Sequence, residues 1–210
     1  MICQMFHTVS RMRENCTYGS MRGRTYPAGA SRSTLHPSDS NILVLCYNST
    51  ILYMKDQLLN ADYRDMVTCL QSEGVEFMLV GGYAVGLHGW PRTTFDIDFW
   101  ILANPKNAAA LMRALKRFGA PLMDLSEEDF YVPGIVFQIG TEPQRIDILS
   151  SVSGVKYEDA VSRAELMQVD GLSLKVISLE DLIMNKRASG RPKDIADALA
   201  LEKLRERKNG

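Results

Sequence analysis

The fold is decided by residues 75–98, which read VEFMLVGGYAVGLHGWPRTTFDID. The apolar run 75–80 predicts a buried strand, and residues 83–88 predict a short helix. Gly81 and Gly82 would therefore lie at the turn between them. Because glycine has no Cβ, backbone N–H groups can approach a triphosphate there, and the positive end of the helix adds to the attraction. The turn is a candidate phosphate-binding site.

Two acidic residues follow the glycine pair after a gap of thirteen residues. A second strand is predicted over 93–102, and Asp96 and Asp98 would point to the same face of it because strand side chains alternate. Two ionised carboxylates side by side repel each other unless a cation neutralises them. Hard oxygen ligands favour Mg²⁺ or Mn²⁺, so the pair predicts a metal site.

Each half of this pattern also has an ordinary interpretation. The glycines could form a plain turn, and the aspartates could lie on a solvated strand face. Asp is depleted in strands, however, and here it occurs twice within the apolar stretch 95–102. The combination of a phosphate cradle with paired carboxylates indicates nucleotidyl transfer.

A third carboxylate lies in the strand-like stretch RIDIL at 145–149. Asp147 would share a face with Arg145 and Leu149. In a two-metal site, a carboxylate from a neighbouring strand holds the ion that activates the attacking hydroxyl or takes its proton. We therefore take Asp147 as a candidate. The alternative is an Asp that pairs with its neighbour Arg145 at a sheet edge.

These motifs resemble a known family, the small bacterial nucleotidyltransferases of the DNA-polymerase-beta superfamily. The most similar branch is AbiEii-like, which is associated with abortive infection and toxin–antitoxin systems. The resemblance covers about residues 65–205 and rests on five stretches: LVGGYAV at 79–85, LHG at 87–89, PRTT at 91–94, DIDFW at 96–100 and LIMNKRASGRPKD at 182–194.

The resemblance implies a role for each matching residue. Asp96, Asp98 and Asp147 would be catalytic and would hold two Mg²⁺ or Mn²⁺ ions. Lys186 would contact the nucleotide, and Asp194 is the acidic residue that follows it. Gly81 and Gly82 would hold the nucleotide phosphates.

The glycine pair departs from the wider superfamily, in which the second glycine is usually Ser. A phosphate-binding hydroxyl is thus absent at Gly82, and the backbone or Arg92 would have to replace it. Arg92 could reach a phosphate oxygen with its guanidinium group, or it could be an exposed loop residue.

Other polar residues allow two interpretations. Four basic residues surround Gly190 and could neutralise a triphosphate or form a solvated helix junction: Lys186, Arg187, Arg191 and Lys193. The family resemblance favours the first. His88 is expected to cap or pack a helix end rather than to act as a base.

The composition divides the chain at Met54. Residues 1–53 carry five arginines but no lysine and lack helical periodicity, so we expect a disordered leader or a start codon that the cell does not use. Residues 54–210 are expected to form one domain, with a catalytic core at about 65–151 and a helical part at about 155–208. The apolar run 42–47 is too short for a membrane span, and we expect a cytoplasmic protein without a disulfide framework or a zinc site.

The remaining sequence predicts an α+β fold: a mixed, twisted sheet with flanking helices and a short helical C-terminal segment. Helices are expected at 62–73, 105–118, 157–167 and 178–189, and a last one from Arg191 with Ile195, Ala198 and Leu199 facing inward. Strands are expected at 134–139 and 145–149, joined by a turn that contains Pro143 into an antiparallel hairpin, and a short strand or extended segment is expected at 172–177.

The predicted reaction moves a nucleoside monophosphate from an NTP to an acceptor hydroxyl and releases pyrophosphate. An RNA end such as that of tRNA, a protein or a small molecule are all open as acceptors, and the resemblance favours RNA or protein. A cognate toxin or antitoxin is a possible partner. The alternative is a non-catalytic module of the same fold that acts by contact, as an antitoxin does.

Overall fold

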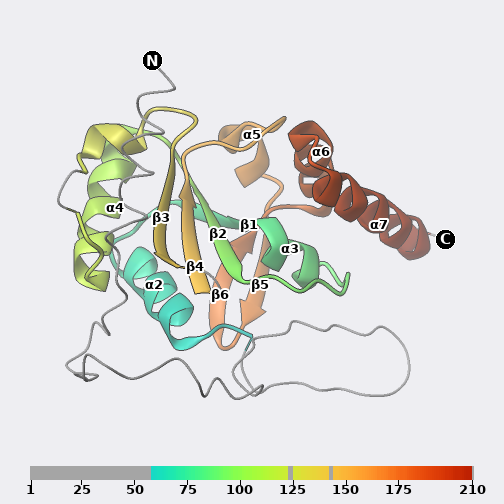
Figure 1. The fold of residues 1–210 in the computed structure, drawn as a ribbon, viewed down its shortest axis with the longest axis horizontal. Helices are drawn as coiled ribbons and strands as arrows, with labels where there is room; N and C mark the ends of the chain where they lie inside the picture. The colour runs from blue at the N-terminus through green and yellow to red at the C-terminus, as the bar shows by residue number, and fades with distance from the viewer. Residues whose placement is uncertain (1–57, 123–124, 142–143, 210) are drawn as a thin grey trace.

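The computed structural model describes residues 58–122, 125–141 and 144–209. They form a mixed six-stranded sheet in the order β3-β4-β2-β1-β6-β5, with helices packed around it (Figure 1). The predictions for residues 1–53 and for the turn at Pro143 lie outside these ranges. None of the described helices is long and apolar enough to cross a membrane.

The predicted strand–turn–helix–strand unit lies at the centre of the sheet. It consists of β1 (Phe77–Val80), α3 (Gly81–Leu87) and β2 (Asp96–Ile101), whose ends differ from the prediction by up to three residues. The helix begins at the glycine pair itself. β1 and β2 are antiparallel, and their register places Val80 opposite Asp98, which brings the glycine turn next to the acidic strand.

The stretch with the third aspartate pairs directly with β2. β3 (Val136–Thr141) and β4 (Gln144–Leu149) form the expected antiparallel hairpin, and β4 runs parallel to β2. Because β3 covers its other side, β4 is an interior strand rather than a sheet edge.

Two longer helices, α2 (Ala61–Ser72) and α4 (Pro105–Phe118), pack against each other. Asn104 caps α4 by accepting a hydrogen bond from the backbone N–H of Asn107, and Gly119 ends the helix in the left-handed conformation. The short 3₁₀ helix η2 (Glu127–Phe130) contacts α4. The predicted start, cap and end of α4 are confirmed.

The helix predicted over 157–167 is wrong in its second half. α5 (Tyr157–Val161) is a single short helix, and residues that follow it form the edge strand β5 (Glu165–Val169), paired with β6 (Leu172–Val176). Asp170 and Gly171 join these strands with φ values of 51° and 79°. Such a two-residue Asp-Gly turn is typical of a tight hairpin, so the sequence contained the signal.

The C-terminal helices α6 (Leu179–Ser189) and α7 (Pro192–Asn209) pack on each other at one side of the molecule (Figure 1). Ser178 caps α6 through the backbone N–H of Asp181, as predicted. The inward face of α7 differs from the prediction: Ala198 is buried, but Leu199 is 47% exposed, and Asp194 and Asp197 are buried instead. Ion pairs with the preceding helix explain this exchange.

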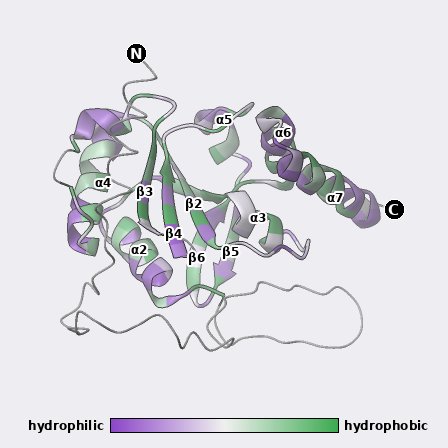
Figure 2. Ribbon diagram, in the orientation of Figure 1, coloured by the Kyte–Doolittle hydropathy of each residue, from purple (hydrophilic) through white to green (hydrophobic). Residues whose placement is uncertain are grey.

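Apolar residues concentrate on the strands and on the inner sides of the helices (Figure 2). The largest fully buried side chains include Trp100 and Phe99 of β2, and Phe99 packs edge-on against Phe77. Asp96 and Asp98 therefore lie on a strand whose later residues are packed in the core, and this packing restricts the movement of the strand backbone.

Candidate active site

The three predicted aspartates lie together on neighbouring strands. In the parallel register of β2 and β4, Asp98 lies opposite Asp147 and Asp96 lies opposite Arg145. All four side chains alternate to the same face of the sheet. A segment 49 residues further along the chain thus places its carboxylate beside the Asp-x-Asp pair.

Arg145 connects two of these carboxylates. Its Nε donates to Oδ1 of Asp147 at 2.6 Å, and its Nη2 donates to Oδ2 of Asp147 at 3.0 Å and to Oδ2 of Asp96 at 2.9 Å. Gln138 of β3 also donates to Asp147, at 3.2 and 3.3 Å. The pairing of Asp147 with Arg145 is the alternative that the sequence left open, but it occurs in the sheet interior and extends to Asp96.

Asp98 has a different environment. Within the described part of the chain its side chain makes no hydrogen bond or ion pair. Burial raises the pKa of Asp98 from 3.8 to about 7, together with the negative charges of Asp96 and Asp147, against the opposing effect of Lys186 and Arg145. A half-buried carboxylate crowded by two others in this way is a suitable ligand for a cation.

The glycine turn packs directly on the acidic residues. Gly81 has a φ of +67°, and an ideal Cβ on it would lie 2.6 Å from Cγ of Asp98 and closer still to Oδ2. A Cβ on Gly82 would lie 2.6 Å from Oγ1 of Thr94. No other residue fits at either position without displacing a side chain of the site.

Thr94 is a site residue that the sequence reasoning missed. Its hydroxyl lies beside Gly82 and donates to Oδ1 of Asp96 at 2.7 Å. Both oxygens of Asp96 are thereby held, one by Thr94 and one by Arg145. A single hydroxyl in a loop has no distinctive pattern in sequence, so only the contact identifies it.

Lys186 and Asp194 form a buried ion pair between α6 and α7. Nζ of Lys186 lies 2.6 Å from Oδ1 of Asp194 and 3.5 Å from Oδ2 of Asp197. Burial alone would raise the pKa of Asp194, but its bonds with Lys186, Ser189 and Arg191 outweigh this and lower it to about 2. The two predicted residues are thus brought together. The alternative prediction, that Lys186 belongs to a solvated helix junction, is wrong because its side chain is only 6% exposed.

Asp197 joins this pair to the loop before β2. Nε of Arg92 lies 3.2 Å from Oδ1 of Asp197, and Nη1 of Arg92 donates to the carbonyl of Thr93. Arg92 is therefore a partly buried connector between that loop and α7. The sequence reasoning missed Asp197, although its spacing of three residues from Asp194 puts both on one helix face.

His88 makes no hydrogen bond or ion pair with the three aspartates in the described part of the chain and packs at the end of a helix, as expected. Its ring is buried, and Nε2 lies 2.7 Å from the carbonyl oxygen of Ile177. Burial lowers the pKa of His88 despite this contact. The residue ends α3 and links it to Ile177, the residue that follows β6.

The donor set fits a divalent cation in type and in backbone placement. Asp96, Asp98 and Asp147 offer hard oxygen ligands on two paired strands, and their mutual repulsion needs neutralising. The carboxylates of Asp96 and Asp147 bond to Arg145 and Thr94 instead, and no three acidic, His or Cys side chains among the described residues converge closely enough to hold an ion as they stand.

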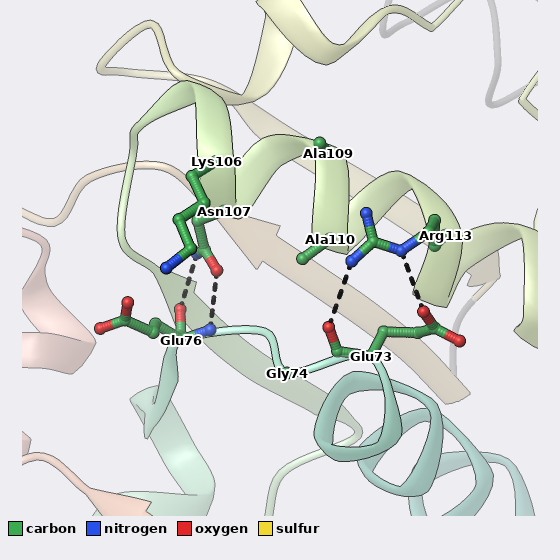
Figure 3. Close-up of a pocket in the computed structure, with 8 residues that line it drawn as sticks. All are labelled: Glu73, Gly74, Glu76, Lys106, Asn107, Ala109, Ala110 and Arg113. Atoms are coloured by element: carbon green, nitrogen blue, oxygen red, sulfur yellow. Dashed lines mark hydrogen bonds and ion pairs between the residues drawn. The ribbon is translucent and has the colours of Figure 1, made fainter.

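A separate pocket of about 290 Å³ is lined by Glu76 and by residues of α4 (Figure 3). Glu76 precedes β1 and Gly81 follows it, so the pocket lies at the other end of this strand from the glycine turn. Asn107 lines it and bonds to both the backbone N–H and the carbonyl of Glu76, while Arg113 pairs with Glu73 at 3.0 Å. These contacts attach α4 to the start of β1 and to the end of α2. Asn107 and Arg113 thus bond to other residues of the pocket lining, and none of the predicted site residues belongs to that lining.

Comparison with protein families identifies the chain. The family described as "Nucleotidyl transferase of unknown function (DUF2204)" matches residues 59–209. The chain belongs to this family. It is accordingly a nucleotidyl transferase, and the predicted α+β nucleotidyltransferase fold with a mixed sheet is confirmed. An NTP substrate follows from membership, and divalent metals are typical of such enzymes.

Two solved structures match most of the chain at low sequence identity. A provisionally assigned nucleotidyltransferase from Thermotoga maritima is 15% identical, with a TM-score of 0.43, and the match covers 70% of this chain and 89% of that one. The antibiotic-resistance factor ANT(2'')-Ia is 13% identical, with a TM-score of 0.46 and coverage of 71% and 83%. A comparison with curated protein sequences found no match.

Proposed function

We propose that this nucleotidyl transferase moves a nucleoside monophosphate from an NTP to an acceptor hydroxyl, with release of pyrophosphate. The observation that carries the proposal is the register of β2 and β4, which sets Asp147 directly beside Asp98 next to the glycine turn. Asp98 is crowded by two other carboxylates in a partly buried place and has no bonded counter-charge among the described residues, so the cluster favours a catalytic purpose.

Asp96, Asp98 and Asp147 would hold two Mg²⁺ or Mn²⁺ ions. When bound, the ions would neutralise phosphate charge and lower the pKa of the acceptor hydroxyl. Asp147 is the residue that would take the acceptor proton, because it lies on the neighbouring strand. Most of the remaining catalysis is positioning of the reacting groups in line.

The nucleotide would lie between the glycine turn and α6. Gly81 and Gly82 leave room for phosphates, and the hydroxyl of Thr94 beside Gly82 is placed to support them. Lys186 provides a positive charge that acts on Asp98, and Asp194 holds Lys186 in position. Arg92 would contact a phosphate from the loop that ends at β2.

The acceptor is proposed to be an RNA end, such as that of tRNA, or a protein hydroxyl in the cytoplasm. A net charge of -1 does not favour binding along an extended stretch of nucleic acid, but a single RNA end needs only a local basic patch. Through its similarity to the AbiEii-like branch, the chain would belong to a toxin–antitoxin pair.

A transfer assay tests this function. The full chain is incubated with Mg²⁺, each α-labelled NTP in turn, and either total tRNA or cell lysate, with the Asp98→Asn variant in parallel. We expect label on RNA or protein with the wild type only. Label on neither, or equal label with Asp98→Asn, would contradict the proposal.

A second candidate is a non-catalytic binding module that acts as an antitoxin does. The observation in its favour is that Arg145 neutralises Asp96 and Asp147 without any metal. Such a module would protect cells from a cognate toxin equally well with Asp98→Asn. Loss of protection in that variant, if it is folded, would exclude the module.

A further inference from the structure

Arg145 occupies the space that Asp96 and Asp147 share. Its guanidinium makes two bonds to Asp147 and one to Asp96, with donor–acceptor distances between 2.6 and 3.0 Å. The side chain of Arg145 is 18% exposed and that of Asp147 is 7% exposed, so the bonds are shielded from water. Charge-assisted, bidentate bonds of this kind are among the stronger polar contacts in proteins.

The hydrogen bonds use the same oxygens that a metal would need. Both carboxylate oxygens of Asp147 accept hydrogen bonds from Arg145, and Gln138 donates to both oxygens as well. Oδ2 of Asp96 accepts a hydrogen bond from Arg145, and Oδ1 of Asp96 accepts one from Thr94. A divalent ion held by Asp96 and Asp147 together would need these same oxygens, and the charge of the guanidinium would repel it.

We propose that Arg145 is an internal counter-cation that competes with the metal. In the metal-free protein it neutralises Asp96 and Asp147 and stabilises the paired strands, and its side chain has to release their oxygens before both carboxylates can bind an ion. Asp98, which Arg145 does not bond, stays open to a cation throughout. The inference rests on the proposed function, because it assigns the metal to the same three aspartates.

The competition has a measurable consequence for affinity. Part of the free energy of metal binding is spent on breaking three charge-assisted bonds, so the intact chain should bind metal more weakly than a chain without the guanidinium. An arginine with a purely structural role would have the opposite effect, because its removal would loosen the strands and weaken metal binding.

The experiment titrates Mn²⁺ into the full chain without nucleotide and follows free Mn²⁺ by electron paramagnetic resonance. Arg145→Gln keeps a polar side chain but removes the charge, and Arg145→Lys keeps the charge without the fork that reaches both carboxylates. Arg163→Gln is the matched control, since Arg163 forms a similar bidentate pair with Asp181 at 2.8 and 3.0 Å outside the site.

We expect Arg145→Gln to bind Mn²⁺ at least about tenfold more tightly than the wild type, Arg145→Lys to lie between them, and Arg163→Gln to match the wild type. Thermal unfolding adds an independent readout. In EDTA the melting temperature of the Arg145→Gln chain should be lower than that of the wild type. Mn²⁺ should raise the melting temperature of the variant by more than it raises that of the wild type.

Two failures are distinguishable. Mn²⁺ binding that is lost in Asp98→Asn but is equal or weaker in both Arg145 variants would overturn the counter-cation and leave the proposed function intact. Absence of Mn²⁺ binding in the wild type and in both folded Arg145 variants would overturn the proposed metal site and the inference with it.

Discussion

At the scale of single residues, the three aspartates are unequal although their sequence contexts look alike. Asp96 and Asp147 share the charge of Arg145, whereas Asp98 has no bonded partner among the described residues and takes the repulsion of both. The difference arises from where each side chain lies relative to one guanidinium. The raised pKa of Asp98, about 7, brings its change of charge close to neutral pH.

The first prediction concerns Asp98→Asn in metal-free buffer. The pKa of Asp98 is raised to about 7 in the folded protein, so the unfolded chain loses this proton near pH 4 and the folded chain keeps it longer. The contribution of Asp98 to the free energy of unfolding is therefore largest below pH 4, and it declines as the pH rises to about 7. The variant should therefore match the wild type near pH 4 and gain about 1 to 2 kcal/mol at pH 8, after discounting for partial solvent exposure.

Urea unfolding of both chains between pH 4 and pH 8 in EDTA measures this difference. Glu206→Gln serves as control, because Glu206 is an exposed carboxylate on α7. A constant difference between Asp98→Asn and the wild type across the pH range would contradict the raised pKa.

The second prediction concerns Lys186, which is both a nucleotide-contact candidate and half of a buried ion pair. Lys186→Met should abolish transfer and also lower the free energy of unfolding by about 3 kcal/mol, since it leaves Asp194 buried with fewer partners. The double variant Lys186→Met/Asp194→Asn should recover part of this loss.

Arg187→Ala is the matched control for this pair. Arg187 is the next residue of α6, and it pairs with Glu202 of α7 at 2.7 Å but in an exposed position. Its loss should cost no more than about 1 kcal/mol. Equal destabilisation by the two single variants would show that burial does not determine the strength of these pairs.

At the scale of elements, the site depends on where a helix may begin. α3 starts at Gly81 directly after β1 because only glycine combines a φ of +67° with the close approach of Asp98. β5 gives a second example. Its residues have a composition compatible with a helix, yet the Asp-Gly turn and pairing with β6 make them a strand.

The third prediction concerns Gly81→Ala. A methyl group there would overlap the carboxylate of Asp98 in addition to adopting a strained φ. We expect loss of transfer activity and a drop in the free energy of unfolding of about 2 to 3 kcal/mol. The measurements are urea unfolding and the transfer assay.

Gly74→Ala separates strain from overlap. Gly74 has nearly the same φ, +70°, but nothing lies within 4 Å of an ideal Cβ there. This variant should lose only about 1 kcal/mol and retain activity. If Gly81→Ala and Gly74→Ala change the free energy of unfolding and the transfer activity equally, the close approach of Gly81 to Asp98 does not contribute to function.

At the scale of the whole molecule, polar contacts hold the C-terminal helices to the core next to the site. Arg92 reaches from the loop before β2 to Asp197 of α7, and Asp197 in turn approaches Lys186 of α6. α3 also contacts α6. Movement of α6 and α7 relative to the sheet would therefore displace Lys186 from the aspartates.

The fourth prediction concerns Arg92→Gln. We expect it to raise the Kd for NTP about tenfold, because both a phosphate contact and the link to α7 are lost. The free energy of unfolding should change by less than about 1 kcal/mol, since Arg92 is partly exposed. Isothermal titration with a non-hydrolysable NTP analogue and urea unfolding give the two values.

Arg205→Gln is the corresponding control. Arg205 of α7 pairs with Glu180 of α6 at 2.8 Å on the surface, so its loss affects the same two helices without reaching the core loop. Nucleotide affinity should remain at the wild-type value. An Arg92→Gln chain with unchanged affinity would remove Arg92 from the nucleotide site.

The sequence by itself determined the central unit of this protein. The apolar run before Gly81, the glycine pair and the alternation around Asp96 and Asp98 are local patterns, and local periodicity and turn chemistry are sufficient to predict a strand, a turn and a shared face. The caps at Asn104 and Ser178 were predictable for the same reason, since their hydrogen bonds close within one helical turn.

Only the tertiary structure decided which charges meet. The pairing of Asp147 with Arg145, its extension to Asp96, and the buried contact of Lys186 with Asp194 depend on strand register and on helix packing. Such contacts join residues up to 49 positions apart, and no local pattern specifies their distance or burial. Burial in turn sets the pKa of Asp98, because the cost of a charge depends on the dielectric environment and on its neighbours in space rather than along the chain.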